Sequence, residues 1–198
     1  MSAQMLQDLK TLVEVESPTD DLAACIKVVN TANQITQRLI GSKAGILDEK
    51  GRPVYWLGSK TPQVVLLAHL DTVWPVGSFT PLWQVDGDVV RGPGIYDMKA
   101  GFIQALYAMK DLDLNKVALI ATTDEETGSA TSRELIEKVS KQAKAVLVLE
   151  SAIDGKVKMV AKVPRCTRSP FMVARLMPVS NLRKASTPPL KSPRLLIP

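Results

Sequence analysis

The residues best suited to metal chemistry stand directly after an apolar run. The chain has one histidine, His69, which occurs in the sequence His69-Leu70-Asp71 after the apolar residues 64–68. In an extended backbone, side chains two residues apart lie on the same side, and imidazole nitrogens and carboxylate oxygens are both zinc ligands. This pair therefore predicts a compact metal-ligating site at the end of a buried strand.

Further carboxylates occur at comparable positions along the chain. Asp97 follows the loop 91–94 and precedes a helical pattern, the acidic residues 124–126 follow the apolar run 117–122, and Glu150 follows the run 145–149. Carboxylates gathered in one place repel one another, and a bound cation removes that cost. If these segments meet in space, the sequence predicts a metal site.

The elements that must position these residues alternate along the chain. Strand-like runs occur at 44–47, 54–57, 64–68, 117–122 and 145–149, and helical patterns at 5–13, about 20–40, 98–112 and 131–141. Continuous apolar strands joined by helices indicate an α/β fold with three layers, in which a mostly parallel central sheet carries helices on both faces. Ligands of such sheets bind at the carboxyl ends of the strands, where the acidic residues are expected.

Each of these features also has an ordinary structural explanation. His69 could be a hydrogen-bonded structural residue, residues 124–126 a solvated turn, and Asp97 a helix cap. Gly94 and Gly101 could be plain loop glycines or could allow a close approach of the backbone. The metal site is favoured because all the acidic groups are expected at the same sheet edge.

Charge is distributed unevenly over the 198 residues, although the formal net charge is +5. Residues 162–198 contain eight basic and no acidic residues, seven of the thirteen prolines and no glycine, whereas residues 1–161 contain 17 basic and 20 acidic residues. This composition predicts a folded, mildly acidic part at 1–161 and a disordered basic tail at 162–198. The tail has a single aromatic residue, Phe171, for stacking on bases, so a solvated tail is favoured over nucleic-acid binding.

Composition also bounds the cellular context. No stretch is long and apolar enough to span a bilayer, and the first ten residues do not resemble a signal peptide. Cys25 and Cys166 do not form a disulfide framework or a CxxC motif. We therefore predict a cytoplasmic protein that binds neither membranes nor nucleic acid.

Four motifs together resemble those of the co-catalytic zinc peptidase and deacylase family. They are residues 69–75 (HLDTVWP), 92–101 (GPGIYDMKAG), 122–129 (TTDEETGS) and 147–150 (LVLE). The family includes glutamate carboxypeptidase, acetylornithine deacetylase, succinyl-diaminopimelate desuccinylase and aminoacylase, and the glutamate carboxypeptidase branch is the most similar. The resemblance implies a zinc-exopeptidase-like catalytic domain and hydrolysis of an amide near a free carboxylate, in a small peptide or an N-acyl amino acid.

The resemblance also implies a role for each site residue. Two zinc ions, with cobalt or manganese as alternatives, would be bridged by Asp97, with His69 and Glu150 on one ion and Glu126 on the other. The remaining two residues would not bind metal: Glu125 would be the general base and Asp71 would orient the histidine. The chemistry suits these types, because bound zinc activates water and polarises a carbonyl.

The sequence departs from the family near residue 160. Members of the family have a lid and dimerisation domain from about this point, form homodimers through it, and supply a further histidine ligand later in the chain. Reading the back-translated tail from the third base of each codon permits a string that resembles the lid-domain motif of the family, beginning at Phe171. We interpret residues 1–161 as the first part of the catalytic domain, followed by a frameshift near Lys162 from a gene lesion or a sequencing error. The alternative function is a truncated, non-catalytic remnant that at most binds metal.

Overall fold

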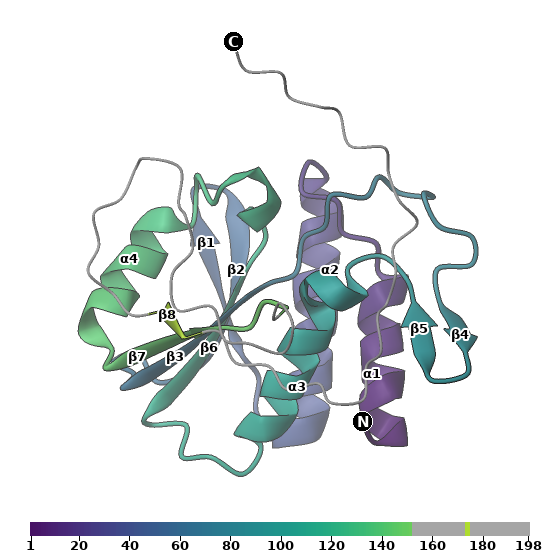
Figure 1. Cartoon of the computed structure of the whole chain (residues 1–198). Coiled ribbons are helices and arrows are strands. Elements are labelled where there is room, and N and C mark those ends of the chain that lie inside the picture. Colours follow the sequence, from purple (N-terminus) through teal and green to yellow (C-terminus); the bar gives the residue numbers. More distant parts are fainter. Residues whose placement is uncertain (152–172, 175–198) are drawn as a thin grey trace.

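The computed structural model describes residues 1–151 and 173–174 of the chain (Figure 1). The helices are α1 (Ala3–Glu14), α2 (Leu22–Ile40), α3 (Ala100–Met109) and α4 (Arg133–Gln142), with short helical turns η1 (Ile95–Lys99) and η2 (Glu125–Thr127). The strands are β1 (Gly45–Glu49), β2 (Arg52–Gly58), β3 (Val64–His69), β4 (Gln84–Asp86), β5 (Val89–Arg91), β6 (Val117–Thr122), β7 (Ala145–Val148) and β8 (Val173–Ala174).

The central sheet has the order β1-β2-β6-β3-β7-β8. The β6–β3, β3–β7 and β7–β8 pairs are parallel, whereas the β1–β2 and β2–β6 pairs are antiparallel. The predicted α/β fold with a mostly parallel central sheet is therefore confirmed. The parallel strands β6, β3 and β7 lie side by side, so the residues that follow them meet at one edge of the sheet.

Helices cover both faces of the sheet, as predicted. Because side chains alternate along a strand, Tyr55 and Leu57 of β2 pack with α1, α2 and α3, whereas Val54 and Trp56 pack with Val139 of α4. Figure 1 shows α4 on one side of the sheet and the other three helices on the opposite side. These layers bury β3 and β6 on both faces, and they fix the strand ends that carry the acidic residues.

The helix ends follow from local capping chemistry. Asp21 precedes α2, and its carboxylate accepts a hydrogen bond from the backbone N–H of Ala24 at 2.9 Å. Gly41 ends the helix in the left-handed conformation, with φ +83°, which glycine adopts without a steric penalty. The segment that joins α1 to α2 pairs with the residues after β3, because Thr72 N donates to Ser17 O at 2.9 Å.

Two features differ from the sequence-based prediction. The β4–β5 hairpin was not predicted, because its strands have only three residues each and β4 is exposed. The helix predicted over 98–112 begins at Ala100, after the irregular turn η1. The predicted strands and the other predicted helices match observed elements to within a few residues.

Gly101 shows why the start of α3 lies so close to the sheet. A Cβ atom at this position would collide with the backbone oxygen of Leu149. Of the two explanations for this glycine, close approach of the backbone is therefore the correct one. It brings the η1–α3 junction against the end of β7.

Other predictions fall partly outside the described part of the chain. The basic tail at 162–198 and the frameshift near Lys162 lie outside the described residues, apart from strand β8. Within the described residues, none of the helices is both long and apolar enough to cross a membrane.

Candidate metal centre

His69 is the last residue of β3, a strand that lies between β6 and β7. Its position is fixed by the parallel ladder, in which His69 is the register partner of Thr122, and by a hydrogen bond from Leu70 N to Thr122 O at 2.9 Å. The side chain is 1% exposed. An imidazole held this firmly presents its two nitrogens in fixed directions.

The two ring nitrogens of His69 face different groups. Nε2 lies 3.1 Å from Oδ1 of Asp97 and 3.2 Å from Oε1 of Glu150. Nδ1 lies 3.1 Å from the backbone oxygen of Asp71 and 3.4 Å from its Oδ1. A proton on Nδ1 would be held by Asp71, which leaves Nε2 directed at the other two carboxylates.

The charge of His69 responds to these neighbours. Burial by itself lowers the pKa of the imidazole, but the contacts with Asp71, Asp97 and Glu150 outweigh burial and hold the pKa well above its usual value. In the metal-free chain the imidazolium therefore neutralises part of the acidic cluster. A metal ion would take over this role by displacing the proton from the ring.

Asp71 is fully buried and connects three segments of the site. Its Oδ2 accepts a hydrogen bond from Thr19 Oγ1 at 2.8 Å and another from the backbone N–H of Glu126 at 3.2 Å. The same carboxylate faces His69 through Oδ1. The Asp71 carboxylate therefore contacts both the imidazole of His69 and the turn that carries Glu126.

Asp124 anchors the acidic turn after β6. Its carboxylate accepts four hydrogen bonds, from the backbone N–H and the hydroxyl of both Thr131 and Ser132, at 2.6–3.1 Å. Burial raises the pKa of Asp124, but these hydrogen bonds outweigh burial and lower it overall. Asp124 is thus a structural acid, whereas the next two residues, Glu125 and Glu126, face the histidine side of the turn.

Five of the six predicted site residues form two overlapping groups that could hold metal ions. His69, Glu125 and Glu150 form one, and His69, Asp97 and Glu126 form the other; within each group the potential ligand atoms all lie within 4.8 Å of one another. The sixth, Asp71, contacts His69 on the opposite side of the ring, at Nδ1. All six predicted residues are therefore brought together at one edge of the sheet.

The electrostatics of these residues fit a cation. Burial raises the pKa of Glu126 to about 7, and repulsion from Asp97 and Glu125 adds to the increase against the opposing effect of His69. Burial likewise raises the pKa of Glu125, with repulsion from Glu150 contributing. One imidazole and several carboxylates are a donor set that zinc accepts, and cobalt and manganese accept the same ligand types.

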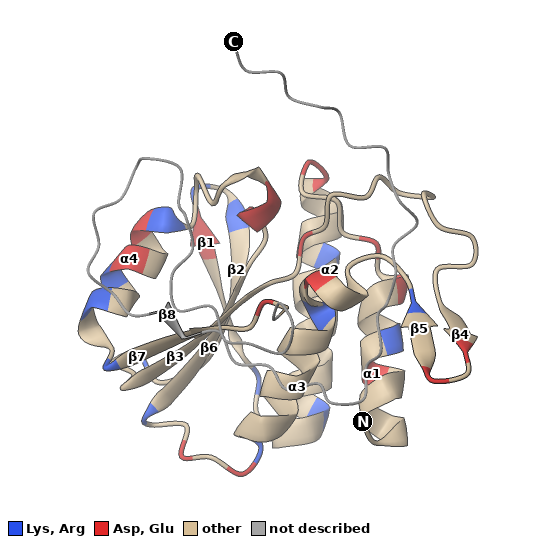
Figure 2. Cartoon of the chain, in the orientation of Figure 1, with Lys and Arg blue, Asp and Glu red and all other residues tan. Residues whose placement is uncertain are grey.

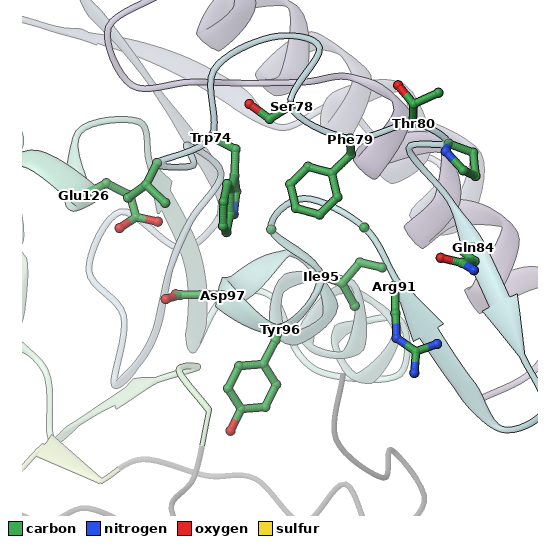
Figure 3. Close-up of a pocket in the computed structure, with 14 residues that line it drawn as sticks. Trp74, Ser78, Phe79, Thr80, Gln84, Arg91, Ile95, Tyr96, Asp97 and Glu126 are labelled. Carbon is green, nitrogen blue, oxygen red and sulfur yellow. The ribbon is translucent and has the colours of Figure 1, made fainter. Parts of the chain in front are cut away.

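A pocket opens beside this cluster. It encloses about 770 Å³, and Asp97 and Glu126 form part of its wall together with Trp74, Phe79 and Arg91 (Figure 3). Figure 2 shows the acidic turn η2 in red near the upper ends of β1 and β2, whereas acidic and basic residues are mixed on α4. The pocket size lies in the range of small-molecule sites.

Some residues of the site were not identified from the sequence. Thr19 contacts Asp71 from a loop more than 50 positions earlier in the chain, and Ser132 contacts Asp124 from the start of α4. The Ser17-Pro18-Thr19-Asp20 sequence marks a turn but carries no signal for this long-range contact. The Asp86-Gly87 dipeptide between two valine-containing runs is a hairpin signal that could have located β4 and β5.

The fold and the site define an α/β protein with a candidate metal centre at the carboxyl edge of its sheet. Residues 65–175, more than half of the chain, match the model of Peptidase family M20/M25/M40, and the chain belongs to this family. It is 36% identical over 103 residues to carboxypeptidase G2 from Pseudomonas sp. (strain RS-16), an alignment that covers 48% of this chain and 25% of that protein. The predicted family membership is therefore confirmed.

Solved structures show the same fold. The M20 family metallo-carboxypeptidase Sso-CP2 from Sulfolobus solfataricus superimposes with a TM-score of 0.60 at 22% identity, over 77% of this chain and 38% of that one. Human carnosine dipeptidase 1 superimposes with a TM-score of 0.55 at 23% identity, over 73% of this chain and 38% of that one. The chain thus spans between a quarter and two fifths of the length of these relatives.

Proposed function

We propose that this chain carries a zinc centre for hydrolysis of an amide bond near a free carboxylate, as in an exopeptidase or an N-acyl amino acid deacylase of the glutamate carboxypeptidase type. The observation that carries the proposal is the buried His69, whose Nε2 lies 3.1 Å from Asp97 and 3.2 Å from Glu150. Membership of Peptidase family M20/M25/M40 supports the same class of reaction.

We assign the ligands as the resemblance implies. His69 and Glu150 hold one ion, Glu126 holds the second, and Asp97 is shared by both. In this assignment Nε2 of His69 binds only one of the two ions. This agrees with the position of Nε2, which faces both Asp97 and Glu150. Zinc bound here would lower the pKa of a water molecule and polarise the scissile carbonyl.

Glu125 is the proposed general base. It precedes Glu126 in η2 and remains exposed to solvent at the site. Its pKa is raised by partial burial, which brings the carboxylate closer to the range of an efficient base at neutral pH. The residue would accept a proton from the attacking water and pass it to the leaving amine. Asp71 would hold His69 without contacting the substrate.

The test separates metal binding from turnover. Glu125→Gln should still bind zinc, whereas hydrolysis of an N-acyl amino acid or a C-terminal glutamyl peptide should fall by about 100-fold to 10,000-fold. Asp97→Ala should lose zinc and turnover together, because both ions share this carboxylate. A Glu125→Gln variant that hydrolyses the substrate as fast as the parent would contradict the assignment of the base.

The alternative is a protein that binds metal without catalysis. It is favoured by the single histidine of the sequence, which limits the chain to one imidazole ligand. Zinc binding by the 198-residue chain without turnover would support this alternative. Turnover that a chelator abolishes and zinc restores would exclude it.

A further inference from the structure

Lys99 is a lysine that the fold encloses completely. It follows Asp97 by two positions at the end of η1, and 0% of it is exposed. A lysine is almost never fully buried unless its amine has partners. Here Nζ donates to Leu12 O at 3.1 Å and to Val15 O at 3.0 Å, so both acceptors are backbone oxygens. The side chain therefore fastens the end of η1 to another element, the helix α1.

The two acceptors lie at the carboxyl end of α1. Leu12 is in the last turn of this helix and Val15 caps it. The last carbonyl groups of a helix have no partner within the helix and carry a partial negative charge. Because α1 has no basic residue in its own last turn, Lys99 supplies the donors from a distant part of the chain. An uncharged amine would keep two N–H groups, enough for both carbonyls, so the contact does not depend on the protonation state.

The turn η1 is fixed at both ends, and Asp97 lies between them. Lys99 N donates to Gly94 O at 2.8 Å, which closes the turn. Gly94 has a φ of +68°, and a Cβ added there would lie 2.6 Å from Cγ2 of Thr72. The side chain of Asp97 is 57% exposed, so neighbouring side chains cover less than half of it. The position of this carboxylate therefore depends on the backbone of η1 and on what holds that backbone.

The segment after α1 also contacts the strand end that carries His69. The buried Ser17 donates a hydrogen bond from Oγ to Leu70 O at 2.7 Å. Through Ser17 this segment supports the end of β3, and through Lys99 the end of α1 supports the turn that carries Asp97. The two supported side chains meet in the site, where Nε2 of His69 lies 3.1 Å from Oδ1 of Asp97. The carboxyl end of α1 is thus a common support for both.

From these contacts we propose that Lys99 is a positioning residue of the metal centre, which binds the carboxyl end of α1 and thereby holds Asp97 opposite His69. Lys99 acts through the backbone of η1 and contacts neither substrate nor metal. The inference rests on the proposed function, in which Asp97 is the ligand shared by both ions. A lysine that only capped α1 would stabilise the fold but would leave the contact between Asp97 and His69 unchanged.

The first measurement needs no metal. Because the chain has one histidine, NMR of the imidazole nitrogens in an isotopically labelled, untagged protein at one fixed pH reports on His69 alone. Lys99→Met removes the N–H donors but keeps a long unbranched side chain. Its His69 signals should move in the same direction as those of Asp97→Asn, which removes the charge opposite Nε2. Loss of the lysine charge alone would favour the imidazolium and would move the signals the other way.

The second measurement is zinc titration in competition with a chromogenic chelator. If Lys99 positions the shared ligand, Lys99→Met should lower the zinc affinity by about 10-fold to 100-fold, the range found when a group that supports metal ligands is removed. This measurement does not depend on turnover.

Arg38→Met is the matched control, because it also replaces a long basic side chain that is bound to α1. Arg38 of α2 pairs with the buried Asp8 of α1 and has no contact with η1 among the interactions of the described residues. Both Lys99→Met and Arg38→Met should lower the free energy of unfolding in urea. Only Lys99→Met should move the His69 signals and weaken zinc binding, which separates positioning of the site from stabilisation of the helix.

The outcomes distinguish this inference from the proposed function. Unchanged His69 signals in a folded Lys99→Met variant, or an unchanged zinc affinity where the parent binds zinc, would overturn the positioning role. If Lys99→Met does not fold, Ser17→Ala decides, since it removes only the hydrogen bond to Leu70 O. Its signals should move toward those of Asp97→Asn, and unchanged signals would overturn the common support. If the parent neither binds zinc nor hydrolyses amides, the proposed function falls, while the NMR measurement still decides the role of Lys99.

Discussion

Substitution of Asp71 tests how the site orients its histidine. Asp71→Asn keeps the shape of the side chain but removes the charge that faces Nδ1 of His69 at 3.4 Å. The carboxylate also holds the turn of Glu126 through the backbone N–H at 3.2 Å. We therefore expect the variant to affect two proposed zinc ligands at once, although Asp71 itself is not a proposed ligand.

The expected magnitude follows from the loss of this support. Removal of the group that orients a metal-bound histidine typically lowers metal affinity by about 10-fold to 100-fold. This corresponds to a loss of about 1.4–2.7 kcal/mol in the free energy of zinc binding. Thr19→Val removes only the hydrogen bond of the hydroxyl to Oδ2 and should cause a smaller loss.

The assay is zinc titration in competition with a chromogenic chelator at pH 7.5, which does not depend on turnover. Asp88→Asn is the control, since it makes the same substitution at an exposed position in the β4–β5 turn. Circular dichroism verifies that each variant is folded. Zinc affinity of a folded Asp71→Asn variant equal to that of the parent would refute the orienting role.

The remaining predictions concern the scaffold. Gly101→Ala should lower the free energy of unfolding by about 1–3 kcal/mol, because the added Cβ would collide with the backbone oxygen of Leu149. Gly45→Ala is the control, since this position has room for a Cβ, and its free energy of unfolding should be nearly unchanged. Urea denaturation measures both variants. Cys25 is buried, and burial with repulsion from Asp71 raises the pKa of its thiol to about 11. In a Cys166→Ser variant at pH 8 it should therefore react with a disulfide reagent at least about 100-fold more slowly than in urea; equal rates would contradict the buried position.

Much of the fold could be predicted because its signals are local. The apolar runs that became β3 and β6 are buried on both faces, so their composition alone identifies them as central strands. The carboxyl-end rule then places His69 and Glu150 at one edge without knowledge of the strand order. The helix predicted over about 20–40 is α2, whose observed ends are also set locally, by the Asp21 cap and by Gly41.

The support of the site was harder to predict because it depends on contacts between distant segments. The role of Asp71 in orienting His69 was expected, but its hydrogen bond from the backbone of Glu126 requires the turn after β6 to lie beside the end of β3. Asp124 was grouped with the metal-facing acids, yet its hydrogen bonds turn it toward α4. Asp124, Glu125 and Glu126 are consecutive acidic residues, so the sequence does not distinguish their roles. Only the direction in which each side chain points in the fold separates them.

Diffraction from zinc-soaked crystals at the zinc absorption edge tests the central claim most directly. We predict two anomalous peaks at the carboxyl edge of the sheet, one bound by His69 Nε2 and Glu150 and one bound by Glu126, with Asp97 shared between them. Ligand distances should be about 2.0–2.2 Å. A histidine ring with no zinc at Nε2, or zinc bound only away from Asp97, would contradict the account.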